Sequence, residues 1–186
     1  PAFILGPHAG KLILIDSQTF TMDCTVGQQN ECFANEYPAH EVTLNVPFYI
    51  GETEVTQLEY SSVMGVNPSY FTECGGDCPV EQISWHDAAA FANALSLSEE
   101  LVACYDCIDG ECEPTMNPYQ CSGYRLPTEG EWEAAARCGE DLMHVGSDNI
   151  DNVGWYEQNS ANTTHQVRQK SPNSCGLYDM SGNVWE

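Results

Sequence analysis

Apolar and polar positions alternate in several short stretches near the start of the chain. These stretches are rich in β-branched and aromatic residues, and they cover residues 10–15, 19–22, 42–46 and 48–50. Because successive side chains of a strand point to opposite faces, this pattern predicts short strands with one apolar face. A polar, acidic loop from Cys24 to Pro38 separates the second strand from the third.

Three capping boxes mark the starts of helices. In this motif a Ser or Thr side chain accepts a backbone hydrogen bond three positions later, where an acidic side chain bonds back. The boxes are Thr56-x-x-Glu59, Ser84-x-x-Asp87 and Thr128-x-x-Glu131. We expect the first helix to end near Gly65, the second to cover residues 88–95, and the third to cover residues 131–137 and end at Gly139.

The rest of the chain has little periodicity. Residues 95–130 combine turn-forming Pro and Gly with four cysteines, which predicts a loop stapled by disulfides. From Gly139 onward Asn, Ser, Gly and Asp dominate, and such a long irregular stretch needs bound ions or disulfides to fix it. These features predict a single α+β domain over residues 1–186 that is rich in loops and has a small sheet.

The charge of the chain excludes several classes of partner. Its 186 residues contain 28 Asp+Glu and 5 Lys+Arg, which gives a formal net charge of −23. A field of this sign repels nucleic-acid phosphates and anionic lipid headgroups and attracts cations such as Ca²⁺. The sequence has no apolar run of about 18 residues, so we expect neither nucleic-acid binding nor membrane insertion. The acidity also fits a surface that serves only solubility.

Ten cysteines indicate an oxidising compartment. Cytosolic proteins rarely carry so many unless they bind metal, whereas exported proteins use them in disulfides. Cys104-x2-Cys107, followed by Cys112 and Cys121, could imitate a zinc ribbon, but the surrounding loop is acidic. A thioredoxin-like use of Cys104 and Cys107 lacks the strand-to-helix context of that motif. Disulfides are favoured, and we expect an extracellular, cell-surface or periplasmic protein.

The spacing of the cysteines suggests how they pair. Short loops with turn-forming residues favour local bridges, and the four cysteines between residues 104 and 121 allow three connectivities, of which we favour the nested one. The predicted bridges are Cys24–Cys32, Cys74–Cys78, Cys104–Cys121, Cys107–Cys112 and, as the remaining pair, Cys138–Cys175.

Recognisable blocks follow one another over nearly the whole chain. They are residues 20–22 (FTM), 36–42 (EYPAHEV), 48–56 (FYIGETEVT), 79–88 (PVEQISWHDA), 124–137 (YRLPTEGEWEAAAR) and 176–186 (GLYDMSGNVWE). In this order they resemble the formylglycine-generating, or sulfatase-modifying factor, family, with Asp23 in place of a usual glycine. The resemblance implies a loop-rich α+β fold related to C-type lectins, with short helices and a small, mostly antiparallel sheet.

The resemblance also implies a chemistry. Enzymes of this family oxidise a sulfatase cysteine to formylglycine with oxygen, using copper bound by two cysteines that follow the NVWE motif. None of the ten cysteines here matches that pair, so we assign no catalytic residue, and copper is expected only if a further catalytic segment exists. The sequence ends inside the motif at Glu186, so we expect the domain to be completed by a longer parent protein or a separate chain.

Our leading interpretation is a secreted binding or structural module that is not catalytic as this chain stands. Its partner would be a protein or glycan at the cell exterior, or another copy of itself. The alternative is the N-terminal part of a copper-dependent oxidase that acts on a sulfatase cysteine. A carbohydrate-binding lectin rests on fold analogy alone.

The resemblance further implies a calcium site in the last motif. Its ligands would be the side chains of Asp179 and Glu186 and the carbonyls of Gly182 and Val184. Calcium prefers such oxygen ligands, and the two carboxylates would repel each other without a cation. Otherwise Asp179 merely caps a turn and Glu186 is solvated.

A second calcium site is implied at the side chain of Asn152 and the carbonyl of Val153. Its further ligands would lie between Asn159 and His165, at positions that the resemblance does not fix. Ca²⁺ is therefore the expected cofactor of the chain.

Overall fold

Residues 10–28 and 32–185, which the computed structural model describes, belong to two units of interleaved segments. Unit 1 consists of Pro1–Lys11 and Glu54–Leu126, and unit 2 consists of Leu12–Thr53 and Pro127–Glu186. Because the segments alternate along the sequence, neither unit is one continuous piece of chain. The expectation of one domain over residues 1–186 stays a prediction.

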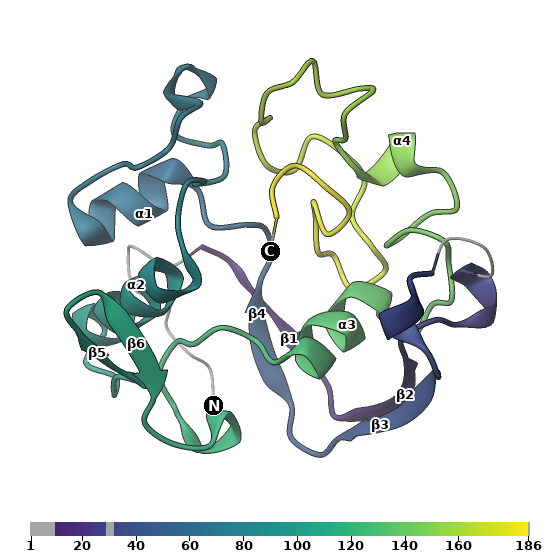
Figure 1. Cartoon of the computed structure of the whole chain (residues 1–186), viewed down its shortest axis with the longest axis horizontal. Helices are drawn as coiled ribbons and strands as arrows, with labels where there is room; N and C mark the ends of the chain where they lie inside the picture. The colour runs from purple at the N-terminus through teal and green to yellow at the C-terminus, as the bar shows by residue number, and fades with distance from the viewer. Residues whose placement is uncertain (1–9, 29–31, 186) are drawn as a thin grey trace. The chain divides into compact units, whose positions relative to one another are not determined.

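Unit 2 contains two antiparallel pairs of strands (Figure 1). β1 (Leu12–Ile15) pairs with β4 (Phe48–Gly51), and β2 (Gln18–Met22) pairs with β3 (His40–Leu44). Helix α3 (Glu129–Arg137) contacts β2 and β3, and α4 (Ile150–Val153) is a single turn. Ile15, Ala135 and Leu177 form the buried centre of this unit.

Unit 1 contains two helices and a hairpin (Figure 1). Helix α2 (Trp85–Ser98) contacts α1 (Gln57–Met64) and both strands of the hairpin, β5 (Tyr105–Ile108) and β6 (Glu111–Pro114). The buried hydrophobic residues of unit 1 form two clusters. They are Tyr60, Val80, Phe91 and Leu95 in the first cluster, and Ala89, Ala92, Cys104, Tyr105 and Cys112 in the second.

Short 3-10 turns complete both units. Those in unit 2 are η1 (Val26–Gln28) and η2 (Ala34–Glu36), and those in unit 1 are η3 (Thr72–Cys74) and η4 (Pro118–Gln120). No helix in the part of the chain that the structure describes is long and apolar enough to cross a membrane.

All three predicted capping boxes form. Thr56, Ser84 and Thr128 each accept from the backbone N–H three residues on, and the acidic side chain there bonds back. The predicted end of α1 near Gly65 and the last residue of α3, Arg137, are confirmed, but α2 and α3 begin three and two residues before the predicted ranges. α2 continues to Ser98 instead of stopping at residue 95, and α3 ends with Cys138 in the left-handed conformation, one residue before Gly139.

The bounds of the four predicted strands agree with the structure to within two residues, but the hairpin of β5 and β6 was not predicted. The third strand runs from His40 to Leu44 instead of residues 42–46, since Val46 lies in the bend before Pro47. The hairpin of β5 and β6 lies inside residues 95–130, which we expected to be a loop. Its turn is Asp109-Gly110, both with positive φ, and Asp-Gly is a favoured pair for such two-residue turns.

Five disulfides form, and each lies within one of the two units. They are Cys24–Cys32 and Cys138–Cys175 in unit 2, and Cys74–Cys78, Cys104–Cys121 and Cys107–Cys112 in unit 1. These are the pairs predicted from the sequence, and no cysteine is free. So many bridges indicate an oxidising environment outside the cytoplasm.

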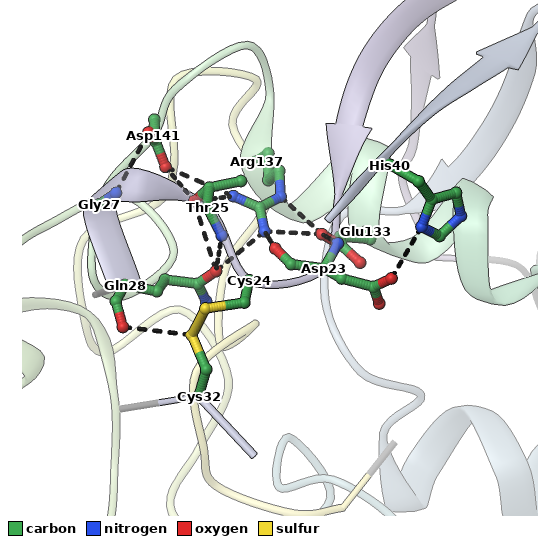
Figure 2. Close-up of polar contacts among 10 residues, drawn as sticks. All are labelled: Asp23, Cys24, Thr25, Gly27, Gln28, Cys32, His40, Glu133, Arg137 and Asp141. Carbon is green, nitrogen blue, oxygen red and sulfur yellow. Dashed lines mark hydrogen bonds and ion pairs between the residues drawn. A yellow bond between two sulfur atoms is a disulfide. The ribbon is translucent and has the colours of Figure 1, made fainter. Parts of the chain in front are cut away.

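Arg137, at the end of α3, holds the loop that follows β2 (Figure 2). Its guanidinium pairs with Glu133 one turn earlier at 2.7 Å. It also donates to three acceptors of the loop: Asp23 O at 2.6 Å, Gln28 Oε1 at 3.0 Å and Thr25 Oγ1 at 3.1 Å. One planar, permanently charged group therefore fixes residues 23–28, whose regular structure is limited to the short 3-10 turn η1.

Candidate functional site

The last motif begins at a firmly anchored point. Leu177 is buried in the core of unit 2, and the backbone N–H groups of Cys175 and Leu177 donate to Asn173 Oδ1, each at 3.0 Å. The Asn173 amide donates in turn to the carbonyls of Ala135 and Ala136 at the end of α3, both at 2.9 Å. The residues that follow therefore start from a rigid base.

Asp179 carries the chemistry of this loop. Its residue is only 3% exposed, and its Oδ2 accepts from Arg168 N at 2.8 Å, whereas its Oδ1 is buried without a hydrogen-bond partner. Burial raises the pKa of the Asp179 carboxyl, although the hydrogen bond from Arg168 and the charge of that residue act in the opposite direction. A buried carboxylate oxygen without a donor is costly, and a bound cation would satisfy it.

Gly182 shapes the turn that follows Asp179. Its φ is 130°, and a Cβ atom at this position would lie 2.2 Å from the carbonyl oxygen of Trp155. No other residue fits there without moving the backbone. Asn183 N donates to the same Trp155 carbonyl at 2.8 Å, so the loop lies directly against this tryptophan.

Trp155 and His165 fix the other side of the loop. Their rings stack with centroids 3.8 Å apart, and Lys170 Nζ lies 4.0 Å from the centroid of the Trp155 ring. His165 N donates to Asn183 Oδ1 at 2.9 Å, and Asn183 Nδ2 donates back to His165 O at 3.1 Å. This reciprocal pair joins the segment from Asn159 to His165 to the loop that carries Asp179.

Arg168 links the loop that carries Asp179 to Glu52, which directly follows β4. Its Nε pairs with Glu52 Oε2 at 2.7 Å, and Glu52 O accepts from Tyr178 N at 2.9 Å. Arg168 has a φ of 65°. This left-handed conformation is the one in which its N–H meets Asp179.

The second expected calcium site is less defined. Asn152 is exposed on α4, its amide donates to Ser147 Oγ at 3.4 Å, and its carbonyl accepts from Ser171 N at 2.9 Å. Val153 is buried, and Asn159 Nδ2 donates to Asp151 Oδ1 and Gly154 O near it. These contacts order the region without showing a ligand set.

The described residues bring together only part of the expected ligands. Within residues 10–28 and 32–185, no group of three or more His, Cys, Asp or Glu side chains could hold a metal ion. Glu186, the second carboxylate expected at the first site, lies outside the described residues. Asp179 fits a cation ligand because of its unsatisfied buried oxygen, and Gly182 fits the close turn that carbonyl ligands require.

Comparison with known proteins decides the family. A sequence model of the sulfatase-modifying factor enzyme 1-like domain matches residues 7–186. The chain belongs to this family. The predicted fold class, a loop-rich α+β fold of the C-type-lectin-like kind with short helices, is confirmed, although the described strands form separate two-stranded antiparallel sheets and not one small sheet.

The proteins to which this chain is similar have diverse names. Chaperone protein LppX of Paenibacillus barcinonensis is 38% identical over 185 residues, which cover 82% of this chain and 65% of LppX. A formylglycine-generating enzyme of Thermomonospora curvata is 29% identical over 126 residues, covering 58% of this chain and 32% of the enzyme. The chain therefore spans less than two thirds of the length of either relative.

A solved structure supports the same assignment. Treponema denticola variable protein 1 superimposes with a TM-score of 0.75 at 34% sequence identity, covering 93% of this chain and 70% of that protein. Proteins that resemble this chain in sequence or structure therefore include ones whose names specify no oxidase activity.

Several residues of the candidate site were not identified from the sequence. Trp155, His165 and Arg168 position the loop through stacking, backbone bonds and an ion pair. The tryptophan in an otherwise polar, irregular stretch was the available signal, because a large side chain there needs packing partners. No sequence pattern marks the left-handed conformation of Arg168.

Proposed function

We propose that this chain is a secreted, calcium-binding module of the sulfatase-modifying factor family with a binding or structural role. The observation that carries the proposal is the Asp179 carboxylate, which is buried with one oxygen lacking any hydrogen-bond partner. The ion would bind the Asp179 side chain with the carbonyls of Gly182 and Val184 and the side chain of Glu186. Calcium would balance the negative charge of the buried carboxylate and bind its unsatisfied oxygen.

The surroundings of the loop support this role. The net charge of −23 draws cations toward the molecule, and the described segment around Asp179 is irregular, so an ion would add order where secondary structure does not. A second ion would bind at Asn152 and Val153. In this role the module would present a rigid surface to a protein or glycan partner outside the cell, or to another copy of itself, since five bridges already restrict its loops.

Calcium-dependent melting tests the proposal. Calcium at a hundredfold its dissociation constant should stabilise the protein by about 2.7 kcal/mol per site. For a chain of this size that corresponds to a rise in Tm of roughly 5–10 °C. Chelation should remove this rise, and Asp179→Ala should abolish the part due to the first site.

The matched control is Glu157→Ala, which removes an exposed carboxylate from the same irregular region. Its calcium-dependent rise in Tm should equal that of the wild type. Calorimetric titration with CaCl2 gives the number of sites directly. A wild type that releases no heat and shows no change in Tm on chelation would refute calcium binding.

The alternative function is the N-terminal part of a copper-dependent oxidase that converts a sulfatase cysteine to formylglycine. Relatives named formylglycine-generating enzyme, 29% and 31% identical, favour it. All ten cysteines of this chain are in disulfides, so copper ligation would need thiols outside them. The test is to incubate a cysteine-containing sulfatase peptide with the full-length parent protein, copper and oxygen, and to analyse the peptide by mass spectrometry. Only the oxidase, and not a binding module, yields formylglycine.

A further inference from the structure

The hairpin of β5 and β6 presents two very different faces. Its inner face packs on α2 (Figure 1), where Tyr105 and Cys112 are 8% and 1% exposed. The residues that alternate with these point the other way. We call this outer surface the hairpin face, and it consists of Asp106, Ile108 and Glu113, whereas the Glu111 carboxylate reaches back to His86 of α2.

The hairpin face combines like charges with an exposed apolar side chain. Asp106 lies directly opposite Glu113 across the two strands, and Ile108 lies directly opposite Glu111. Like charges at such positions destabilise a sheet. Ile108 is 65% exposed, although an isoleucine at the surface of a sheet gains stability only when something covers it.

The repulsion on this face is not relieved within the described part of the chain. No Lys or Arg occurs in the sequence between Lys11 and Arg125. Glu111 pairs with His86 at 2.8 Å, but Asp106 and Glu113 form no ion pair with any residue that the structure describes. The charge on the hairpin face is therefore available to an external cation.

The backbone beneath the face is rigid. The Cys107–Cys112 disulfide joins directly opposite residues, with 4.0 Å between their Cα atoms. Asn93 on α2 accepts from Cys104 N at 3.0 Å and Tyr105 N at 3.1 Å, and donates to Tyr105 O at 2.8 Å. A preorganised surface loses little conformational entropy on binding, so even modest contacts can yield affinity.

We propose that the hairpin face is a docking surface for an extended, cationic segment of a partner protein. Lysine or arginine side chains of the partner would pair with Asp106 and Glu113, and an apolar side chain between them would cover Ile108. Both strands are edge strands of a two-stranded sheet, so the partner could also add a strand. The inference rests on the proposed binding role and names the chemistry of the partner, without using the calcium site.

Other occupants fit this face less well. A second copy would bring the same acidic side chains against themselves, and nucleic acid or an anionic membrane would be repelled. A glycan offers no positive charge to offset the facing carboxylates. Only a cationic partner gains from the arrangement.

Fluorescence anisotropy with a defined peptide tests the inference. The probe is a labelled seven-residue peptide of alternating lysine and valine, and its matched control replaces every lysine with glutamate. The full chain, with calcium present, should bind the first peptide and not the second. The double variant Asp106→Asn with Glu113→Gln should weaken binding about tenfold, and Ile108→Ser about fivefold.

The control variant separates this face from the general negative field. Glu73→Gln with Asp77→Asn removes two exposed charges of the same unit, also beside a disulfide, and should change the affinity less than about twofold. An equal loss in both double variants, or no binding by the wild type, overturns the inference. So does a concentration-dependent dimer in sedimentation that the Asp106 and Glu113 substitutions abolish.

Two further measurements keep the outcomes distinct. Non-reducing mass spectrometry shows whether each variant retains its disulfides, so a misfolded protein is not counted as a binding defect. Asp179→Ala should bind the lysine and valine peptide as the wild type does. Calcium binding and peptide binding can therefore fail separately.

Discussion

Asp179 and Gly182 place different demands on the loop that carries them. Asp179 buries a carboxylate with one unsatisfied oxygen, and Gly182 brings the backbone against the carbonyl of Trp155. Asp179 and Asn183 both adopt positive φ, at 62° and 69°. Aspartate and asparagine enter this left-handed region more readily than other residues apart from glycine. The turn around Gly182 is therefore built from residue types that tolerate a left-handed backbone.

The identity of the glycine at position 182 should be essential. Gly182→Ala should destabilise the protein by about 3 kcal/mol or more, because the new Cβ would meet Trp155 O at 2.2 Å in addition to the strain of its φ. The measurement is urea unfolding in metal-free buffer.

The control for that substitution is Gly176→Ala in the same motif. Gly176 also has a positive φ, of 88°, but its Cβ would meet nothing within 4 Å. It should therefore lose only about 1 kcal/mol. Equal losses for the two variants would show that the contact with Trp155 does not matter.

Residue roles were only partly predictable from the sequence. Asp179 and Gly182 could be assigned by resemblance, and the loop geometry suits that assignment. Trp155 and Arg168 could not, because their roles depend on contacts between distant segments of the chain. Sequence periodicity reports local structure, whereas these contacts are tertiary.

At the scale of elements, local signals predicted the starts of helices well. Each capping box satisfies free N–H groups of a first turn, which is a short-range effect. The end of α2 depends on packing instead: Leu95 and Ser96 are both buried, so the helix continues to Ser98. The Asp109-Gly110 pair predicts a hairpin turn, but the four cysteines of this segment led us to expect a loop instead.

The contact between α3 and the loop after β2 depends on the shape of Arg137. Arg137→Lys keeps the charge but cannot serve Glu133, Asp23 O, Gln28 and Thr25 together, because a lysine lacks the planar fork. We expect a loss of about 2–3 kcal/mol in urea unfolding, since these acceptors are partly buried. Proteolysis should cut the loop faster than in the wild type.

Arg168→Lys is the comparison for Arg137→Lys. Arg168 has a single ion pair, with Glu52, and its side chain is 48% exposed. Its replacement should cost less than about 1 kcal/mol. A loss as large as that of Arg137→Lys would mean that the network of Arg137 has no special weight.

At the scale of the whole molecule, stability is divided between cores and covalent bridges. Each unit has its own buried clusters, and each disulfide joins residues of one unit. The high net negative charge opposes compaction through self-repulsion. The count of cysteines predicted the number of bridges and their spacing suggested the pairing, but the interleaving of the two units is a property of topology that no local pattern encodes.

The bridges should differ in what they contribute. Cys138–Cys175 closes a sequence separation of 37 residues, and Cys107–Cys112 closes only 5. A bridge restricts the unfolded chain more when it closes a longer loop, so removing the first should cost about 4 kcal/mol and removing the second about 2 kcal/mol. The comparison uses paired Cys→Ala variants in urea unfolding without reductant. The hairpin should survive the loss of its bridge, because Asp109-Gly110 still sets its register. If the two variants lost the same stability, native packing around the bridges, and not the entropy of the unfolded chain, would govern their effect.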